Sequence, residues 1–241
     1  MAGRVVLVTG ASGGLGTALA RAAAAAGATL VLLGRKVPPL ERLYDELVAT
    51  GAAEPALYPL DLEGASAADY ETLAQAIEQA CGALHGIVHA AARFDGLIPF
   101  ELGDPLAWLA TLHVNLSAPI QLTRACLPLL SKQGGSVVFV GDDPERVTRA
   151  NWGAYGISKA ALAGVVRQLD LECEHNGVRV HGFVPGPMRT RLRAKAYLAE
   201  DAAELTAAEV YAPACLKLLT EAGVGWRGKM CDARGYRSAQ G

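Results

Sequence analysis

The chain has 241 residues, of which 51% are hydrophobic and 19% charged, and its formal net charge is −2. This apolar content is enough for a full core, which argues against a disordered protein. The weak net charge gives no reason to expect a nucleic acid or an anionic membrane as a partner.

Taken in chain order, short apolar runs alternate with longer amphipathic ones. The expected strands are Val5–Val8, Thr29–Leu33, Ala56–Leu60, Gly86–His89, Ser136–Val140, Val178–Val184 and about 228–232. The expected helices are Gly14–Ala26, Leu40–Ala49, Ala67–Cys81, roughly Pro105–Leu130, Tyr155–Asn176, and short ones near 190–200 and 206–220. Continuous rather than alternating apolar strands indicate burial on both faces, hence a parallel sheet between helices. We expect an α/β doubly wound parallel sheet (Rossmann fold), a single domain over 1–241, with ligands at the carboxyl edge of its strands.

Neither a signal peptide nor a membrane span is expected. A core strand already starts at Val5, and no window of about 18 apolar residues lacks a charge or a breaker. The five cysteines form no CxxC pair and the five histidines no HExxH motif, so neither a disulfide framework nor a metal site is predicted. These features predict a cytoplasmic protein.

A glycine-rich turn, Thr9–Gly16, follows the first strand and opens a helix. Gly10 permits a tight turn, Gly14 lets the backbone approach a pyrophosphate, and Gly16 permits close helix packing. The helix N-terminus offers free N–H groups and positive partial charge to phosphates. Such a turn alone is as often only a tight loop, but its place in an alternating β/α chain favours a dinucleotide site.

The ends of the second and third strands bear on cofactor choice. Arg35 and Lys36 stand where an acidic residue would select NAD, so they fit the 2'-phosphate of NADP. The alternative is that they are solvated loop charges. Asp61 is a candidate contact for the adenine amino group, or else a turn or helix-cap aspartate.

Tyr155 and Lys159 stand one helical turn apart. A free tyrosine has a pKa of about 10, too high for proton transfer near neutral pH. The charge of Lys159 would favour tyrosinate, and lowering that pKa by about 3 units requires about 4 kcal/mol. Taken alone, the pair would be an ordinary helix pair; together with the glycine-rich turn it predicts an acid/base group.

In order and spacing, these motifs resemble those of the short-chain dehydrogenase/reductase family, in its compact single-domain branch, over essentially the whole chain. The family's TGxxxGxG pattern is Thr9–Gly16 and its YxxxK is Tyr155–Lys159; Val114-Asn115 and Pro185-Gly186 also match. Within the family, the chain is similar to bacterial YciK-type oxidoreductases. Two segments carry this likeness: residues 149–155, and Asp232-Ala233-Arg234-Gly235, which stands in place of a Gly-Gly pair. That likeness implies fold and cofactor more than a substrate.

The resemblance implies an oxidoreductase that passes hydride between NADP(H) and an alcohol/carbonyl pair, with NAD(H) less favoured. Asn115 would hold a water in a proton relay, Lys159 would contact the ribose, and Thr190 would hold the nicotinamide carboxamide. The implied cofactor residues are Gly10, Ser12, Gly13, Gly14, Leu15, Gly16, Arg35, Asp61, Leu62, Ala90, Tyr155, Lys159, Pro185, Gly186 and Thr190. The implied partners are a small-molecule substrate and, through pairing of two helices between subunits, a homodimer or homotetramer.

Two departures from the family pattern matter. His89-Ala90-Ala91-Ala92 replaces an asparagine-containing motif, which removes a hydrogen-bonding anchor. Asp142 stands thirteen residues before Tyr155, where the family has its catalytic serine. An ionised Asp142 would repel a developing oxyanion and raise the pKa of Tyr155, unless the neighbouring Asp143 favours retention of a proton.

Three hypotheses for the aspartate stay open: it substitutes for the serine, the loop swings away from Tyr155, or the protein binds NADP(H) with little turnover, as a sensor or scaffold. The region from about 187 to 210 is expected to cover the substrate. Its cations, Arg189, Arg191, Arg193 and Lys195, hint at an anionic substrate, although solvated charges on a mobile lid are favoured.

Overall fold

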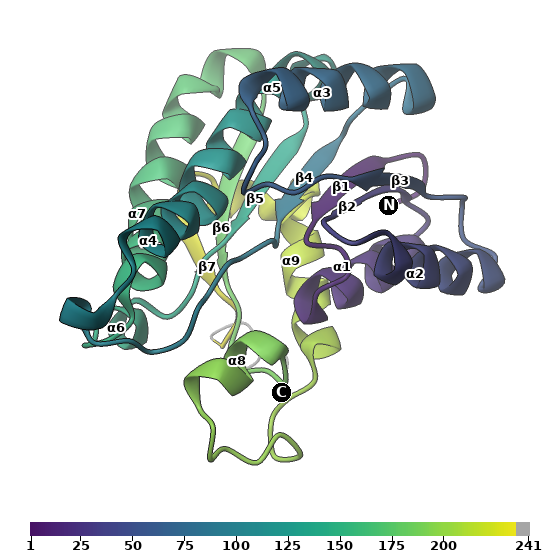
Figure 1. Ribbon diagram of the computed structural model, residues 1–241. Helices are drawn as coiled ribbons and strands as arrows, with labels where there is room; N and C mark the ends of the chain where they lie inside the picture. The colour runs from purple at the N-terminus through teal and green to yellow at the C-terminus, as the bar shows by residue number, and fades with distance from the viewer. Residues whose placement is uncertain (235–241) are drawn as a thin grey trace.

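The computed structural model describes residues 1–234, and its centre is one sheet of seven parallel strands in the order β3-β2-β1-β4-β5-β6-β7 (Figure 1). The strands are Val5–Thr9 (β1), Thr29–Gly34 (β2), Ala56–Pro59 (β3), Gly86–His89 (β4), Ser136–Val140 (β5), Arg179–Val184 (β6) and Met230–Asp232 (β7). Every residue of β1, β4, β5 and β6 is buried, which is why these strands are continuous apolar runs. The predicted doubly wound parallel sheet is confirmed.

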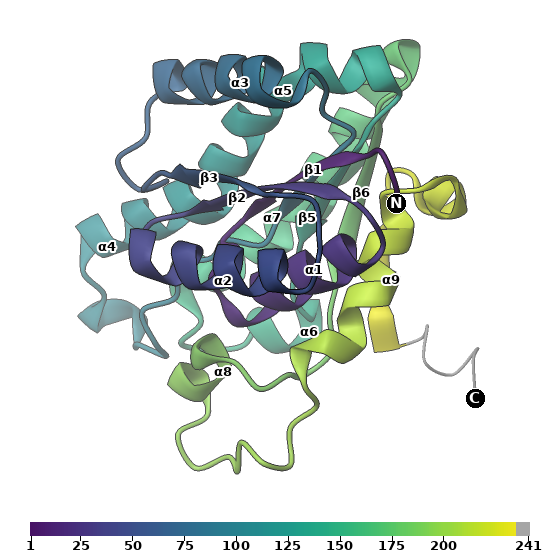
Figure 2. The ribbon, with the colours of Figure 1, turned by 90° about the vertical axis from the view of Figure 1, so that its right-hand side faces the viewer.

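Helices cover both faces of this sheet (Figure 2). One face carries α1 (Gly14–Ala25), α2 (Val37–Ala49) and α9 (Ala212–Leu218), and the other carries α3 (Ala67–Cys81), α5 (Ala118–Gln133) and α7 (Gly153–Glu172). Because successive strand residues point to opposite faces, the strands feed two apolar cores. Leu32 belongs to the first core and Phe139 to the second.

Local signals explain where several helices begin and end. Ser66 and Asp69 form a reciprocal capping box at the start of α3. That helix ends at Gly82, whose φ of 70° suits glycine better than any residue with a side chain. Both ends of α3 agree with the helix expected from the sequence over Ala67–Cys81.

The helix expected as one piece over Pro105–Leu130 is interrupted, so that prediction was wrong in this detail. The structure has α4 (Pro105–Leu112), a π-helical turn η2 (His113–Ser117), and then α5. Pro119 lacks the N–H that would bond to the carbonyl of Asn115 in a regular α-helix, which gives a physical reason for the change of register. The turn contains Asn115.

The remaining elements are short and lie mostly at the carboxyl edge of the sheet. They are η1 (Phe100–Leu102), α6 (Pro144–Val147), η3 (Glu174–Asn176), α8 (Arg191–Ala196), η4 (Ala208–Tyr211) and η5 (Glu221–Trp226). Helix α8 and its flanking chain project beyond the carboxyl ends of the strands (Figure 1). Within residues 1–234, no helix is long and apolar enough to cross a membrane. The predicted domain end at residue 241, and Gly235, lie outside the described residues.

Candidate active site

The glycine-rich turn between β1 and α1 lies against the end of β4. Gly10 has a φ of 63°, and a Cβ there would come within 2.7 Å of the Cα of Ala91. The hydroxyl of Thr9 accepts a hydrogen bond of 3.2 Å from the backbone N–H of Ala91. Only glycine fits this position, because both the conformation and the close approach exclude a side chain.

The start of α1 has two further glycines with different neighbours. A Cβ on Gly16 would come within 2.1 Å of the carbonyl oxygen of Gly10, so Gly16 lets the helix pack on its own turn. A Cβ on Gly14 would come within 2.8 Å of the side chain of Thr190. Ser12, Gly13 and Gly14 are exposed, while Leu15 is buried. The first N–H groups of a helix have no partner within the helix, so this turn can receive a phosphate.

The end of β2 leaves two cations in solvent. Arg35 and Lys36 are exposed, and within residues 1–234 neither side chain has an ion pair or a hydrogen bond. After β3, Asp61 is exposed and accepts a hydrogen bond of 3.2 Å from the N–H of Glu63, the geometry of a turn aspartate, while Leu62 is buried. The charges are thus free to meet a phosphate, and Asp61 has a local structural role.

The chain after β6 lies next to the glycine-rich turn, where Thr190 faces Gly14. Gly186 is buried, and a Cβ there would come within 2.4 Å of the hydroxyl oxygen of Tyr211. Thr190 caps α8, where its hydroxyl accepts a hydrogen bond of 3.2 Å from the N–H of Arg193. Pro185, like Ala90 after β4, is half-buried. The structure therefore brings the Pro-Gly motif, Thr190 and the glycine-rich turn to one edge.

His89, which departs from the family pattern, is a core residue. Its Nε2 atom hydrogen-bonds with the hydroxyl of Thr123 at 2.8 Å, and its ring stacks on Phe139 with centroids 4.8 Å apart. Burial and the nearby charge of Lys159 lower the pKa of His89 to about 3. The imidazole is therefore neutral, and it packs in the core at the end of β4.

Helix α7 buries one face at the site, with Tyr155, Ser158 and Lys159 on it. A Cβ on Gly156 would come within 2.0 Å of the carbonyl oxygen of Val147, so this glycine lets α7 pack tightly against α6. The ammonium group of Lys159 donates a hydrogen bond of 2.7 Å to the carbonyl oxygen of Val140, at the end of β5. The Tyr-x-x-x-Lys spacing therefore places both side chains beside the carboxyl edge of the sheet.

Asp142 points at Tyr155 rather than away from it. The hydroxyl of Tyr155 donates a hydrogen bond of 2.7 Å to the Oδ2 atom of Asp142, and both residues are buried. The hypothesis that the loop swings away from the tyrosine is therefore wrong. Burial raises the pKa of Tyr155 well above its ordinary value, and the charge of Asp142 and this hydrogen bond raise it further.

The expectation that Lys159 lowers the pKa of Tyr155 is not met in this structure. The ammonium nitrogen lies 5.8 Å from the centroid of the tyrosine ring, whereas the carboxylate accepts a hydrogen bond directly from the tyrosine hydroxyl. Burial also lowers the pKa of Lys159 itself to about 8, against an opposing effect of the Asp142 charge. The carboxylate controls the tyrosine because it is the nearer charge.

Asn115 fastens the chain after β4 to α7. Its Oδ1 atom accepts a hydrogen bond of 2.7 Å from the N–H of Arg93, and its Nδ2 atom donates to the carbonyl of Arg93 at 2.9 Å. The same Nδ2 donates to the hydroxyl of Ser158 at 3.1 Å, and that hydroxyl donates to the carbonyl of Tyr155 at 2.7 Å. Both amide hydrogens of Asn115 thus have protein partners, and its role in a water relay stays a prediction.

Arg146 is a site residue that the sequence reasoning missed. Its guanidinium pairs with the Oδ1 atom of Asp142 and lies over the ring of Trp152, 5.3 Å from the centroid, and near that of Tyr197 at 6.0 Å. Burial lowers the pKa of Arg146, but the charge of Asp142 and hydrogen bonds to Asp142 and Tyr197 raise it more. The signal was available, because Asp142 and Arg146 are four residues apart at the start of a helix.

The second carboxylate has its own arginine. Asp143 accepts a hydrogen bond of 2.8 Å from Arg234, which follows β7, and its other oxygen accepts one of 3.1 Å from the N–H of Glu145. Asp142 and Asp143 therefore each face a different cation, and retention of a proton by this pair stays a hypothesis.

The cations of the 187–210 region differ in surroundings. Arg193 pairs with Glu200 at 2.5 Å and lies 4.5 Å from the centroid of the Tyr197 ring. Lys195 donates a hydrogen bond of 2.8 Å to the carbonyl of Phe94. Arg189 and Arg191 are exposed. Lys195 is exposed as well, so the expectation of solvated charges holds for three of the four cations and fails for Arg193.

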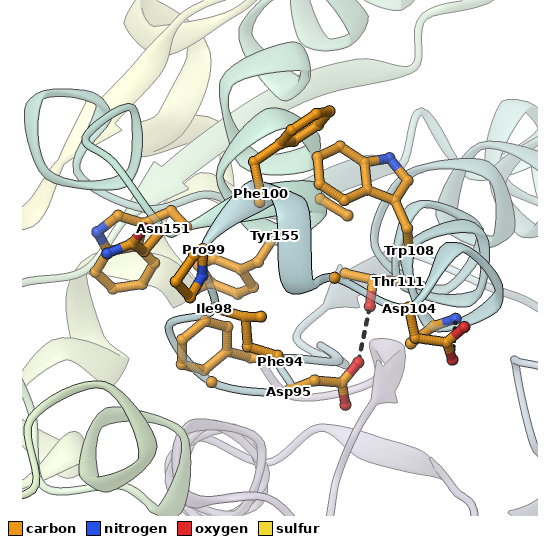
Figure 3. Close-up of a pocket in the computed structure, with 16 residues that line it drawn as sticks. Phe94, Asp95, Ile98, Pro99, Phe100, Asp104, Trp108, Thr111, Asn151 and Tyr155 are labelled. Atoms are coloured by element: carbon orange, nitrogen blue, oxygen red, sulfur yellow. Dashed lines mark hydrogen bonds between the residues drawn. The ribbon is translucent and has the colours of Figure 1, made fainter.

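Aromatic side chains surround the ring of Tyr155 (Figure 3). The ring of Phe94 lies 4.9 Å from that of Tyr155 and 5.3 Å from that of Trp152, measured between centroids. A pocket lies against these residues; its other aromatic lining is Phe100 and Trp108. Neither Asp142 nor Lys159 lines that pocket, so it contacts the ring of Tyr155 and not the carboxylate that binds its hydroxyl.

Comparison with known proteins agrees with this geometry. The family model for short chain dehydrogenases matches residues 4–201. A protein of Escherichia coli K12, described as "Uncharacterized oxidoreductase YciK", is 37% identical over 203 residues, which are 84% of this chain and 80% of that protein.

Solved structures match over nearly the whole chain. A short chain dehydrogenase from Shigella flexneri 2a, complexed with NADP, superposes with a TM-score of 0.93 and is 34% identical, with 97% of this chain and 98% of that one covered. One from Escherichia coli CFT073, complexed with NADPH, gives a TM-score of 0.92 and 35% identity over 97% and 98% of the two chains.

Proposed function

We propose that this chain, which belongs to the short-chain dehydrogenase family, is an NADP(H)-dependent oxidoreductase that acts on an alcohol/carbonyl pair. The observation that carries the proposal is the position of Tyr155: it is buried on α7, one turn from Lys159, and Lys159 is hydrogen-bonded to the end of β5. The choice of cofactor is supported by the NADP and NADPH bound to the similar structures, and by Arg35 and Lys36, which have no partner among residues 1–234.

The residues of the chain have separate parts in this reaction. When bound, the cofactor supplies the hydride that forms the new C–H bond at the carbonyl carbon. Tyr155 gives its hydroxyl proton to the carbonyl oxygen, so that an O–H bond replaces the broken π bond and tyrosinate is left. Lys159 and Arg146 are the nearby cations that stabilise the negative charge left on tyrosinate. Burial and the charge of Asp142 raise the pKa of Tyr155, so the tyrosine is protonated at neutral pH, the form that reduction requires.

The side chains around Tyr155 indicate which carbonyl compounds to test. Phe94, Trp152 and Tyr197 form an aromatic wall beside the tyrosine, with Arg146 over two of the three rings. Such a wall packs well against an alkyl or aryl group next to the carbonyl. We therefore propose apolar or aromatic aldehydes and ketones as the first substrates to test.

A second candidate function is binding of NADP(H) with little turnover. The hydrogen bond from Tyr155 to Asp142 favours this candidate, because the hydroxyl proton that the substrate needs is already donated to a carboxylate. The test is NADPH oxidation with a panel of aryl and alkyl aldehydes and ketones, with Tyr155→Phe as the matched variant. Turnover that the variant loses, with NADPH binding retained, supports the oxidoreductase. NADPH binding with no turnover by either protein would leave the binding role.

We propose the association into homodimers or homotetramers through α4 and η1. The side chains of Phe100, Leu102, Leu106 and Leu109 are between 62% and 84% exposed, and all four are apolar. Exposed apolar patches are characteristic of subunit contacts, and these four side chains lie on two elements that are adjacent in the chain. Helix α4 is part of the fourth helix expected from the sequence, one of the two that the family pairs between subunits.

We also propose the cytoplasm as the compartment of this enzyme. The cysteines at 81, 126, 173, 215 and 231 are all free thiols, and four of the five are buried. Free thiols and an NADP(H) requirement suit a reducing compartment.

A further inference from the structure

We propose that Arg146 donates a hydrogen bond to the substrate's carbonyl oxygen and so takes over the task of the serine that Asp142 replaces. The inference rests on the oxidoreductase function proposed above. It concerns a residue that neither the family motifs nor the sequence pattern assigned to the reaction.

The position of Arg146 follows from a shared carboxylate. Tyr155 donates to the Oδ2 atom of Asp142 and the Arg146 guanidinium pairs with the Oδ1 atom of the same group. The proton donor of the reaction and the guanidinium are therefore separated only by one carboxylate. An oxygen atom that takes the hydroxyl proton of Tyr155 in the proposed reaction would therefore come near the guanidinium as well.

The guanidinium has donors to spare and is held in place. Arginine carries five N–H donors, of which Asp142 and Tyr197 account for only part. The rings of Trp152 and Tyr197 lie against it, 5.3 and 6.0 Å from their centroids, and limit its movement. Its side chain is 24% exposed, against 8% for Asp142, so the arginine is the member of the pair that a substrate can reach.

The charges also favour this role. A lone carboxylate beside the reacting oxygen would oppose the negative charge that develops in the transition state. Pairing with Arg146 offsets that charge, and the guanidinium N–H groups stabilise an oxyanion as a serine hydroxyl would. Arg146 also acts on Tyr155, because its charge lowers the pKa of the tyrosine while Asp142 raises it. Asp142 then serves to orient both groups.

The simplest competing role for Arg146 is neutralisation of Asp142, and the Asp142→Asn background separates the two. Asparagine keeps the shape of the side chain but has no charge to neutralise. If Arg146 is a donor to the substrate, Arg146→Ala in that background lowers kcat by about 100-fold, as loss of an oxyanion donor typically does. If Arg146 only neutralises, the added change leaves kcat of the Asp142→Asn enzyme within about 3-fold, which would overturn the inference.

Two further measurements sharpen the test. In the Asp142→Ser background a hydroxyl is restored, so the loss caused by Arg146→Ala is expected to be at least about tenfold smaller than in the asparagine background. Added guanidinium chloride should restore part of the kcat that Arg146→Ala loses. Arg149→Ala, an exposed arginine just beyond α6, is the matched control for a change of surface charge.

The failure of the inference is distinguishable from failure of the proposed function. Turnover by the natural chain, with Arg146→Ala harmless in the asparagine background, overturns only the role of Arg146. No carbonyl reduction by the natural chain or by Asp142→Ser, despite NADPH binding shown by fluorescence titration, overturns the oxidoreductase function and the inference with it.

Discussion

The carboxylate of Asp142 accepts a hydrogen bond of 2.7 Å from the hydroxyl of Tyr155, both groups being buried. This contact joins the residue that replaces a family serine to the proposed proton donor. It stabilises the protonated tyrosine and so disfavours the tyrosinate that alcohol oxidation would need as its base. The first prediction follows from it.

Asp142→Asn should make alcohol oxidation possible at lower pH. Oxidation needs tyrosinate as the base, and the charge of Asp142 raises the pKa of Tyr155. Without that charge, the uncompensated guanidinium of Arg146 lowers the tyrosine pKa as well. We expect the rising limb of the oxidation rate to move down by about one pH unit or more, equivalent to about 1.4 kcal/mol. The pH profile of kcat with NADP and an alcohol measures it.

Asp143→Asn is the control for this change, because Asp143 pairs with Arg234 and caps α6 rather than contacting Tyr155. In Asp143→Asn, the rising limb of the oxidation rate should stay at the same pH as in the natural chain. A limb that stays in place in Asp142→Asn, or moves to higher pH, would contradict the assigned effect of the carboxylate. Tyrosinate absorbance, compared with Tyr155→Phe, gives the same pKa without turnover.

Lys159 should make the unfolding free energy depend on pH. Its pKa falls from 10.5 in the unfolded chain to about 8 when it is buried, so between these values the unfolded chain binds more protons. The free energy of unfolding therefore rises with pH across that window, and below about pH 8 the full cost of the buried charge, about 3 kcal/mol, is present. In Lys159→Met this pH-dependent contribution disappears.

Urea unfolding at several pH values between about 7 and 10 measures this difference. Other groups titrate in the same range, so the quantity to follow is the difference in unfolding free energy between the natural chain and the variant. That difference should shift in favour of the natural chain as pH rises. Lys132→Met, which alters an exposed lysine paired with Glu78, should show no such trend. A parallel pH dependence in Lys159→Met and the natural chain would refute the shifted pKa.

Arg35 and Lys36 should determine the preference for NADP over NAD. Both are exposed and, within residues 1–234, unpaired, so a 2'-phosphate would gain charge-assisted hydrogen bonds without breaking existing ones. The double change Arg35→Ala with Lys36→Ala should weaken NADP binding about 10- to 100-fold and change NAD binding much less. Fluorescence titration with both cofactors measures the ratio, and Arg42→Ala on α2 is the control. Equal losses for NADP and NAD would argue against a 2'-phosphate site.

The apolar surface of α4 should control oligomeric state. Leu106 and Leu109 are 74% and 62% exposed. Replacing both by glutamate puts charges into the proposed contact, so the molar mass in solution should fall toward that of a single chain. Light scattering after size exclusion measures it. Leu198→Glu, at a 90% exposed position near α8, should leave the mass unchanged. A natural chain that is already monomeric would rule out the proposed contact.

Much of the architecture was predictable because its signals are local or periodic. The buried runs at β1, β4 and β5 needed no knowledge of partners, since an apolar run of strand length between amphipathic helices has few alternatives. The π turn at His113–Ser117 was missed, because a change of one residue in helical register does not alter the apolar pattern. Pro119 is the one local signal of it in the sequence.

The sequence by itself determined the sheet, the glycine-rich turn, and the Tyr155–Lys159 pair with its place on one helix face, because these depend on backbone geometry and short spacings. Only the tertiary structure decided how Asp142 acts, since that depends on which charges meet it. The fold brings Tyr155 and Arg146 to the two oxygens of its carboxylate and sends Asp143 to Arg234, 91 residues away in the chain. The spacing of Asp142 and Arg146 allows their ion pair, but the proton affinities at a buried site depend on distances that the spacing alone does not give.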